Sequence, residues 1–353
     1  MRNPYAPTRP VPRFAVWELT YACNMRCRHC GSNAGGVRNL RPQELTTAEA
    51  LDLADQLAAL GNERITLSGG ELFLRRDWDQ IAARLIANSV GVGLISNGFL
   101  LQRNLARLSA LPGLEVVALS LDGTRATHDY IRRVHGSFDR VIAGFRELHQ
   151  RGLFTAAITS VSKRNIDELD AVHDILVAAG VRGWQLQLVI GEGRIVHTPD
   201  LPDLEDLERL VRFIARRRKR SPLRIDAGDN IGYCTPLAEQ ALAEPWRGCY
   251  AGLLVVGIEA NGNIKGCLSQ HPELMQDNPF VAGNVRQRPL AEIWADDEGF
   301  AYNRRFDRRR VQGACRACPH LRECRCGCTA TAYALHQTKY RTSMCLYQLG
   351  RSR

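Results

Sequence analysis

The sequence predicts an α/β protein in which a partial parallel barrel of six β/α units is followed by a cysteine-rich domain. Three observations lead to this prediction. Between residues 14 and 220, stretches with strand-like and helix-like apolar patterns alternate six times. Glycine-rich or polar residues recur after the first four strand-like stretches. Nine of the twelve cysteines lie at or beyond residue 234, where the alternation has stopped.

Each predicted strand is a short apolar run, and each is followed by a stretch with helix signals. The strands are expected at residues 14–20, 64–68, 92–96, 116–121, 155–161 and 184–190. The helices are expected at residues 46–61, 77–89, 104–110, 138–152, 166–180 and 204–219. The first helix has a threonine N-cap, Thr46 or Thr47, and stops at Gly61. Regular β/α alternation favours right-handed crossovers and hence a parallel, TIM-like partial barrel.

The residues outside the barrel differ in composition. Residues 1–13 hold four prolines and no apolar core, which indicates an irregular arm and not a signal peptide. Residues 221–353 are expected to form a second domain held by cysteines, with a hairpin that turns at Asn261 and Gly262. The domains are therefore predicted at 1–13, 14–220 and 221–353.

Composition and charge narrow the class of protein. The chain is 353 residues long and 45% hydrophobic, which suits a globular fold. No run of eighteen apolar residues occurs, so we expect no membrane span and a cytoplasmic protein. The net charge is +10, with basic runs at 215–220 and 303–310. We interpret these runs as solvated helix faces, with attraction of an acidic peptide as the alternative. No motif indicates binding to a nucleic acid.

The candidate site is predicted at the carboxyl ends of the strands, where β/α barrels carry their chemistry. Cys23, Cys27 and Cys30 follow the first strand. The next three strands are followed by the sequences SGGE (68–71), SNG (96–98) and SLDG (120–123). Each of these alone is compatible with an ordinary turn. Four of them at the same edge of one sheet indicate a binding site.

The three clustered cysteines are soft ligands, which select zinc or iron–sulfur clusters. An electron-transfer cubane cluster is held by four thiolates. Three thiolates leave one iron open to a substrate or cofactor. The alternative is a zinc ion whose fourth ligand is His29 or a distant residue.

The Cys-x3-Cys-x2-Cys spacing after the first strand, with His29 before the last cysteine, resembles the radical S-adenosylmethionine (radical SAM) superfamily. The resemblance implies a [4Fe–4S] cluster on Cys23, Cys27 and Cys30. S-adenosylmethionine would bind the open iron and be cleaved to a 5′-deoxyadenosyl radical, which takes a hydrogen atom from the substrate. The residues implied to contact S-adenosylmethionine are His29 at the adenine, Gly69, Gly70 and Glu71 at the methionine part, Ser96 and Asn97 at the ribose, Ser120 and Arg132 at the ribose and carboxylate, and Gln187 and Leu188 on the last strand. Asp122 is expected to stabilise a turn, and Leu72 stands where family members often have proline.

The tail has the spacing Cys249-x12-Gly262-x4-Cys267, then Cys315-x2-Cys318-x5-Cys324-x3-Cys328, and a final Cys345. This pattern resembles the seven-cysteine SPASM domain, which holds two auxiliary [4Fe–4S] clusters. The resemblance gives Cys249, Cys267 and Cys328 to the first auxiliary cluster and Cys315, Cys318, Cys324 and Cys345 to the second. Cys234 is expected to complete the first cluster, with an open iron as the alternative. Cys326 departs from the pattern and is interpreted as a bystander thiol, and a pair of zinc ribbons is the alternative for the whole tail.

The SPASM resemblance favours maturation of a ribosomally made peptide by cross-linking, thioether formation, epimerisation or oxidation. The expected partners are that peptide and an external reductant such as flavodoxin or ferredoxin. Family members often begin with a peptide-recognition domain that thirteen residues cannot supply. Leader recognition is therefore expected to come from a separate protein or from the barrel rim, or not to be needed. Leu268 follows Cys267 where sulfatase-maturing relatives place an acid, which argues against that activity.

Two other functions stay open. A small-molecule radical SAM oxidoreductase, of the haem-pathway or alcohol-oxidising type, would use the same clusters. The alternative that is not an enzyme is a non-catalytic zinc scaffold that binds a partner protein. The sequence predicts no catalytic acid or base.

Overall fold

The computed structural model describes residues 10–35, 38–228, 230–242, 244–270 and 278–352. Most of the predicted N-terminal arm, residues 1–9, lies outside the described residues. The rest of the arm is anchored, because Asn62 Nδ2 donates to the carbonyl of Pro12 and Trp294 Nε1 donates to that of Pro10. The division of the chain after residue 220 stays a prediction.

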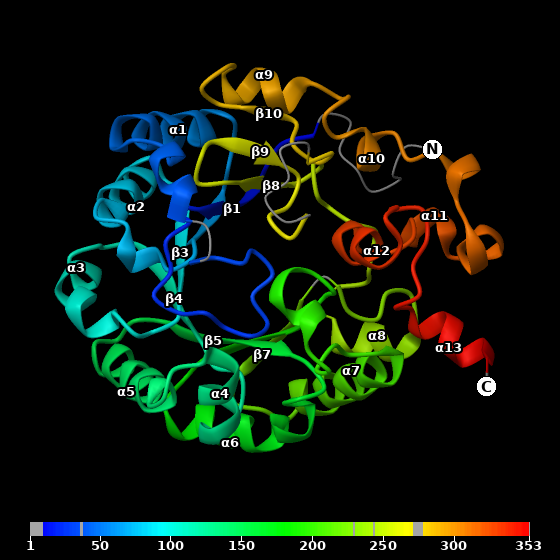
Figure 1. Ribbon diagram of the computed structural model, residues 1–353, viewed down its shortest axis with the longest axis horizontal. Coiled ribbons are helices and arrows are strands. Elements are labelled where there is room, and N and C mark those ends of the chain that lie inside the picture. Colours follow the sequence, from blue (N-terminus) through cyan, green and yellow to red (C-terminus); the bar gives the residue numbers. More distant parts are fainter. Residues whose placement is uncertain (1–9, 36–37, 229, 243, 271–277, 353) are drawn as a thin grey trace.

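A ten-stranded sheet curves around the centre of the molecule in the order β10-β9-β8-β1-β2-β3-β4-β5-β6-β7 (Figure 1). Six neighbouring strands pair in parallel and in chain order. They are β1 (Phe14–Glu18), β2 (Arg64–Ser68), β3 (Gly91–Ser96), β4 (Leu114–Ser120), β5 (Thr155–Val161) and β6 (Gly183–Leu188). The predicted α/β fold with a partial barrel of six β/α units is therefore confirmed.

The sheet continues beyond these six strands at both edges. At one edge, β7 (Arg224–Ala227) pairs in parallel with β6. At the other, β8 (Val255–Ile258) pairs in parallel with β1, and β9 (Asn263–Lys265) and β10 (Gly283–Asn284) follow in antiparallel register. The predicted hairpin at Asn261–Gly262 joins β8 to β9 and is confirmed. Among the residues that the structure describes, the sheet ends at β7 and at β10, so the barrel is open between these two strands.

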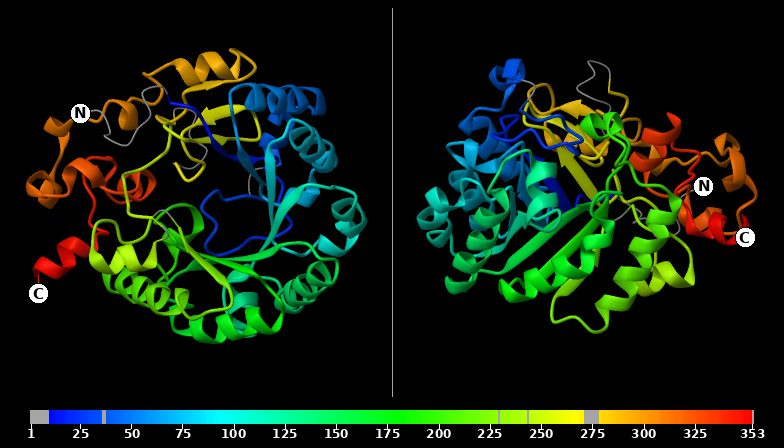
Figure 2. Two further views of the ribbon diagram at one scale, coloured as in Figure 1. Left: turned by 180° about the vertical axis from the view of Figure 1, so that it is seen from behind. Right: turned by 60° about the horizontal axis from the view of Figure 1, so that its bottom comes forward.

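Helices cover the outer face of the sheet (Figures 1 and 2). The six predicted helices are present as α1 (Thr47–Ala59), α2 (Trp78–Ala87), α3 (Leu105–Ser109), α5 (Ser137–Gln150), α6 (Leu169–Ala178) and α7 (Leu204–Arg218). Of the two predicted caps, Thr46 begins α1 in a capping box with Glu49. The sequence reading missed α4 (Arg125–Arg132), because this short helix is polar around most of its surface.

Short helices make up most of the tail. They are α8 (Pro236–Ala241), α9 (Leu290–Ala295), α10 (Ala301–Arg304), α11 (Leu321–Cys324), α12 (Thr329–His336) and α13 (Leu346–Ser352). Within the part of the chain that the structure describes, no helix combines the length and the hydropathy needed to cross a membrane.

Strand alternation decides which side chains face the barrel interior. Trp17, Leu67, Leu119 and Leu186 pack in the large hydrophobic core between the sheet and the helices. Because successive side chains of a strand point to opposite faces, the residues between them face the interior. This face carries Glu18, Ser68, Ser120, Ser160 and Gln187 at the carboxyl ends of the strands. The interior is therefore polar where the predicted site lies.

Candidate functional site

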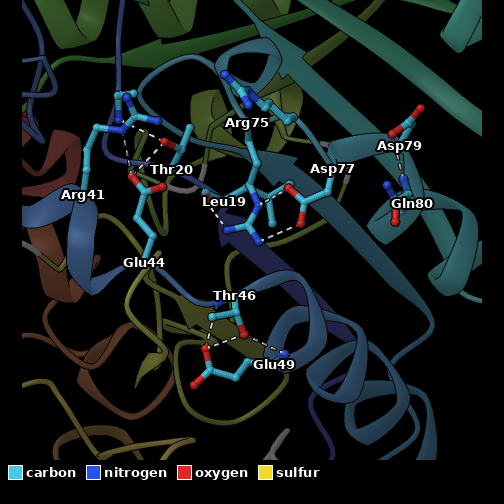
Figure 3. Close-up of polar contacts among 12 residues, drawn as sticks. Leu19, Thr20, Arg41, Glu44, Thr46, Glu49, Arg75, Asp77, Asp79 and Gln80 are labelled. Carbon is cyan, nitrogen blue, oxygen red and sulfur yellow. Dashed lines mark hydrogen bonds and ion pairs between the residues drawn. The ribbon is translucent and has the colours of Figure 1, made fainter.

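The loop that carries the first three cysteines is anchored where it leaves β1 (Figure 3). Arg75, which is buried, donates from Nη1 to the carbonyl of Leu19 at 2.9 Å and holds Asp77 with Nε and Nη2. On the next residue, Thr20 Oγ1 donates to Glu44 Oε1 at 2.8 Å. The start of the cysteine loop is thus held by charged side chains from two neighbouring segments.

Cys23, Cys27 and Cys30 lie together in this loop. The backbone N–H of Met25 donates to Cys23 Sγ at 3.4 Å, and Arg132 Nη1 lies 3.7 Å from Cys27 Sγ. Burial raises the pKa of the Cys23 thiol to about 12 and also raises that of Cys27. Without a metal these two thiols are protonated at neutral pH, so metal binding must release their protons.

Gly69 and Gly70 bring the loop after β2 against the cysteine loop. Gly70 N donates to the carbonyl of Thr20 at 2.7 Å, and Glu71 N donates to that of Ala22 at 2.8 Å. A Cβ atom on Gly70 would lie 2.4 Å from the Ala22 oxygen. Glycine is required here because two backbones approach closely, in addition to any approach of a cofactor.

Glu71 lies at the centre of a buried hydrogen-bond network. Its Oε1 accepts from Ser96 Oγ at 2.7 Å and from Phe73 N at 3.2 Å, and its Oε2 accepts from Asn97 N at 2.8 Å. Asn97 Nδ2 also donates to Asn24 in the cysteine loop at 2.8 Å. Ser96 and Asn97, predicted at the ribose, therefore orient Glu71 as well. A carboxylate has about four acceptor positions, so one remains for a ligand.

Asp122, Arg132 and His29 form a second buried group beside Cys27. Arg132 donates from Nε to Asp122 Oδ2 at 2.7 Å, and His29 Nε2 lies 3.6 Å from the same oxygen. Burial disfavours the charge of Asp122, but Arg132 and His29 offset this and lower the pKa of Asp122. Burial lowers the pKa of His29 to about 4, so the imidazole is neutral at pH 7. Its Nδ1 is buried with no hydrogen-bond partner, which leaves a polar atom for a ligand to satisfy.

The last predicted contacts, on β6, divide between the two faces of the strand. Gln187 Nε2 donates to Ser160 Oγ at 3.1 Å, on the same interior face as Ser120. Leu188 packs in the hydrophobic core on the opposite face. The interpretation that both side chains face a cofactor is therefore wrong for the Leu188 side chain, because adjacent strand residues point to opposite sides.

Arg194 closes the site from the loop after β6, and the sequence reading missed it. Its Nε donates to the carbonyl of Cys27 at 2.7 Å, and its Nη1 donates to Asn33 Oδ1 at 2.6 Å. A Cβ atom on the preceding residue, Gly193, would lie 2.3 Å from the Cys30 oxygen. The run GEGR (191–194) follows the sixth strand as the other polar runs follow theirs, and that was the available signal.

Four ionisable side chains, Glu18, Glu192, Glu259 and Lys265, lie near one another beside this loop. Lys265 on β9 is completely buried and binds Glu259 Oε1 at 2.7 Å. Burial, and then repulsion by Glu259, raises the pKa of Glu18 to about 8. Burial raises the pKa of Glu192 to about 8 as well, and its Oε1 is buried with no hydrogen-bond partner. The sequence reading missed these residues because single charged residues in a strand or loop form no pattern.

In the tail, Cys249, Cys267 and Cys328 form one thiol group. Burial raises the pKa of Cys328, and Cys249 and Cys267 lie near enough to raise it further. Gln270 Oε1 accepts from Cys267 N at 3.1 Å and so holds one member of the group. The structure thus brings together the three cysteines predicted for the first auxiliary cluster.

A second thiol group contains Cys315, Cys318 and Cys345. Burial raises the pKa of Cys345, and Cys315 and Cys318 add to this effect. A hydrogen bond with Cys326 lowers the pKa of Cys315, so the predicted bystander thiol lies inside this group.

The two remaining tail thiols, Cys234 and Cys324, contact each other. A hydrogen bond with Cys324 lowers the pKa of Cys234. This bond joins Cys234 to a cysteine predicted for the second auxiliary cluster, whereas Cys234 was expected beside the first. All twelve cysteines are free thiols.

Comparisons with known proteins identify the family to which the two cysteine-bearing regions are similar. The model of the radical SAM superfamily matches residues 17–176, and that of an iron–sulfur cluster-binding domain, SPASM, matches residues 249–319. The AdoMet-dependent heme synthase of Methanosarcina barkeri is 30% identical over 357 residues, which cover 97% of this chain and 98% of that protein. The chain belongs to the radical SAM superfamily.

Two further proteins are similar to this radical SAM enzyme, one in sequence and one in fold. Mycofactocin maturase MftC of Mycolicibacterium smegmatis is 29% identical over 329 residues, which cover 92% of this chain and 79% of that one. The crystal structure of Streptococcus suis SuiB bound to S-adenosylmethionine has a TM-score of 0.72 and 17% identity, and covers 95% of this chain and 77% of that one. SuiB shows the fold alone.

The radical SAM half offers a donor set that fits its cofactors. Three soft thiols share one loop, the Gly69–Gly70 backbone lies against that loop, and Glu71 and His29 each retain a free acceptor or an unpartnered nitrogen. Within the described residues, no three His, Cys, Asp or Glu side chains converge as ligands of one metal ion do. A cubane binds each thiolate at a different iron, so it accepts more widely spaced ligands than a zinc ion does.

The SPASM half contains two buried cations between its thiol groups. Lys339 and Arg325 are 6% and 3% exposed, and both lie over the ring of Phe306. Burial lowers the pKa of Lys339 to about 7, although the nearby thiols of Cys249 and Cys328 act to raise it. Buried cations are costly unless an anion offsets their desolvation. Thiolate-bound clusters beside them would provide that negative charge.

Proposed function

We propose that this radical SAM/SPASM enzyme modifies a residue of a ribosomally made peptide by cross-linking, thioether formation, epimerisation or oxidation. When bound at Cys23, Cys27 and Cys30, the cluster with S-adenosylmethionine supplies a 5′-deoxyadenosyl radical that removes a hydrogen atom from the substrate. Auxiliary clusters are proposed on the two thiol groups of the tail. The enzyme is proposed to act in the cytoplasm, where thiols stay reduced.

The residues around the cysteine loop would bind and orient the cofactor. Glu71 is held by three donors and keeps one acceptor position for the ammonium of S-adenosylmethionine. His29 would present a neutral imidazole to the adenine, because its pKa is about 4. Arg194 and Arg75 fix the loop itself, so the cofactor meets a rigid cradle.

The ionisable groups of the barrel interior are the observation that most supports a peptide substrate. Glu18, Glu192 and Glu259 contribute three carboxyl groups, whereas Lys265 contributes one ammonium that already binds Glu259. At pH 7 Glu18 and Glu192 are mostly protonated and Lys265 is paired with Glu259, so these four residues offer no unpaired cation to a substrate rich in carboxylates. A thiolate-bound cluster would add repulsion. Neutral peptide amides would meet acceptors and, from protonated Glu18 or Glu192, a donor.

The open side of the sheet supports a long substrate. The sheet ends at β7 and β10, and β7 has a neighbour only at β6 within the described residues. An extended peptide could reach the interior between these edges, and the free edge of β7 offers backbone groups for pairing. The name of the relative mycofactocin maturase, at 29% identity, also supports peptide modification. A separate leader-recognition protein remains part of this proposal.

A tetrapyrrole substrate is the second candidate. It is favoured by the match to an AdoMet-dependent heme synthase over 97% of this chain and 98% of that protein. A tetrapyrrole with carboxylate side chains would have to place them away from Glu18 and Glu192 and near Lys265.

One experiment separates the two substrates. The reconstituted enzyme, S-adenosylmethionine and a strong reductant are incubated either with short peptides encoded beside the gene or with iron coproporphyrin. Mass spectrometry follows loss of two hydrogens or another mass change, and chromatography follows 5′-deoxyadenosine. The proposal predicts a modified peptide. Turnover of the porphyrin with stoichiometric 5′-deoxyadenosine, and no change in any peptide, would replace it with the second candidate.

A further inference from the structure

The net charge of the chain is confined to its last 53 residues. Residues 1–300 contain 35 basic and 35 acidic residues, so their formal charge is zero. Residues 301–353 contain 12 basic and 2 acidic residues, so they carry the whole charge of +10. An acidic partner attracted by this charge would therefore meet the tail and not the neutral barrel.

Several of these basic residues lie near the second thiol group in the chain, and one acts on it through its charge. Arg308 lies on the 3-10 turn η6 (Arg308–Arg310), Arg316 directly follows Cys315, and Arg322 lies on α11. All three arginines are exposed, as is Arg341, whose charge acts on Cys315. We define this set, Arg308, Arg316, Arg322 and Arg341, as the tail arginine surface.

Arg310, which lies two residues after Arg308, is linked to the thiols through one layer of packed side chains. Arg310 stacks on the ring of Tyr340, with its guanidinium carbon 4.4 Å from the ring centroid. Tyr340 packs with Phe306, and both belong to one hydrophobic cluster with Cys315 and Cys326. Cys318 is only half-buried. A cluster on these cysteines would therefore lie one side-chain layer beneath Arg310 and next to Arg316, which adjoins Cys315 in the chain.

The tail arginine surface faces away from the barrel. The segment from η6 to α11 lies at the outer edge of the molecule, with α12 between it and the barrel (Figures 1 and 2). A substrate must enter the barrel interior to meet Glu71 and the cysteine loop. A partner on this outer edge would instead reach only the second thiol group, which suits electron exchange and not substrate modification.

We propose that the tail arginine surface docks an acidic one-electron carrier protein, such as a flavodoxin or a ferredoxin. Its guanidinium groups pair with carboxylates of the carrier and steer it toward Cys315 and Cys318. One electron then passes from the reduced carrier to the cluster at this site; the carrier is oxidised by one electron, the cluster is reduced by one, and no bond forms or breaks. The proposal requires the auxiliary cluster but holds for either candidate substrate.

The test measures binding of an acidic flavodoxin to the anaerobically reconstituted enzyme by calorimetry at low and high salt. Arg308→Glu with Arg322→Glu reverses two charges of the surface. Arg146→Glu with Arg220→Glu makes the same change in net charge at two exposed arginines of the barrel half. We expect the tail variant to weaken flavodoxin binding about tenfold at low salt, the barrel variant less than about twofold, and salt to reduce the difference.

Control measurements keep the outcome interpretable. Iron content and dithionite-driven cleavage of S-adenosylmethionine should match the wild type in both variants. If the tail reversal loses iron, Arg308→Gln with Arg322→Gln makes half of the charge change and should weaken binding about threefold. Equal weakening by the tail and barrel variants would overturn the proposal. So would unchanged flavodoxin binding with loss of binding to a polyglutamate peptide, to phosphatidylserine vesicles or to a DNA oligonucleotide.

Discussion

The radical SAM site of the barrel and the thiol groups of the tail differ in what completes them. In the barrel, Glu71 has three hydrogen-bond donors, and Arg132 has Asp122 as a partner. In the tail, Lys339 and Arg325 are buried beside thiols, and Lys339 is held by the carbonyl of Tyr302 and by Asn303 Oδ1. The barrel site is thus assembled by the chain itself, whereas the buried cations of the tail would be offset by the negative charge of the proposed clusters.

The largest expected effect removes the cofactor from the barrel and leaves the tail intact. Full occupancy of three [4Fe–4S] sites would give about twelve irons per chain. Cys23→Ala, Cys27→Ala and Cys30→Ala together should leave about eight and abolish formation of 5′-deoxyadenosine, because no open iron remains. Iron assay and chromatography check this. An unchanged iron count in the triple variant would refute the assignment of these cysteines.

The preformed network around Glu71 predicts a loss of affinity without a loss of metal. Glu71→Ala removes the proposed acceptor of the ammonium and should weaken S-adenosylmethionine binding by about 10- to 100-fold, which corresponds to a hydrogen bond with a charged partner. Iron content should stay at the wild-type value. Glu63 is an exposed glutamate directly before β2, so Glu63→Ala serves as the matched control and should change neither quantity. If Glu71→Ala lost iron and still bound the cofactor normally, the account of this loop would be wrong.

The buried cations of the tail predict an effect whose sign depends on iron. Lys339→Met removes a desolvated charge, so it should stabilise the iron-free protein by about 1–3 kcal/mol in urea denaturation. In the loaded protein the same change removes a counter-charge and should speed iron loss to a chelator. Arg220→Met, at an exposed position, should do neither. The same sign of effect with and without iron would contradict the proposed role of Lys339.

Glu192 predicts a dependence of stability on pH. Its pKa is raised from 4.5 to about 8, so the folded state keeps a proton that the unfolded state loses. The contribution of this proton to the stability of the folded state is fully present below pH 4.5 and is lost as the pH rises through 8. Glu192→Gln should therefore gain about 3–4 kcal/mol relative to the wild type between pH 5 and pH 8. Urea denaturation at the two pH values measures this, and parallel changes in both proteins would exclude a buried, unpartnered carboxyl.

Much of the fold follows from local pattern. The six strands, their helices and the Asn261–Gly262 hairpin were predictable because each depends on alternation, capping or turn residues within a few positions. The pairing of β8 with β1 was not predictable, because Phe14 and Val255 meet only through tertiary packing. The four residues of β7 are too few to form a recognisable pattern.

The candidate site likewise contains residues that a sequence pattern predicts and residues that no pattern predicts. The cysteines and the SGGE loop carry spacings that a metal and a close backbone approach require. Arg194 and Glu192 each act as a single residue whose importance depends on what lies opposite, such as the Cys27 carbonyl for Arg194. The contact of Cys234 with Cys324 was likewise hidden, because 90 residues of sequence separate them and no spacing rule links them.

The contrast between a preassembled barrel and a metal-dependent tail is tested most directly by hydrogen–deuterium exchange of the iron-free and the reconstituted protein, followed by mass spectrometry. Backbone amides of β1 to β6 should exchange at similar rates in both states, because the sheet and its polar network need no iron. Amides of residues 313–345 should exchange far faster without iron, because buried cations and thiols lose their clusters. Equal protection of the tail in both states, or loss of protection across the barrel strands when iron is removed, would contradict the account.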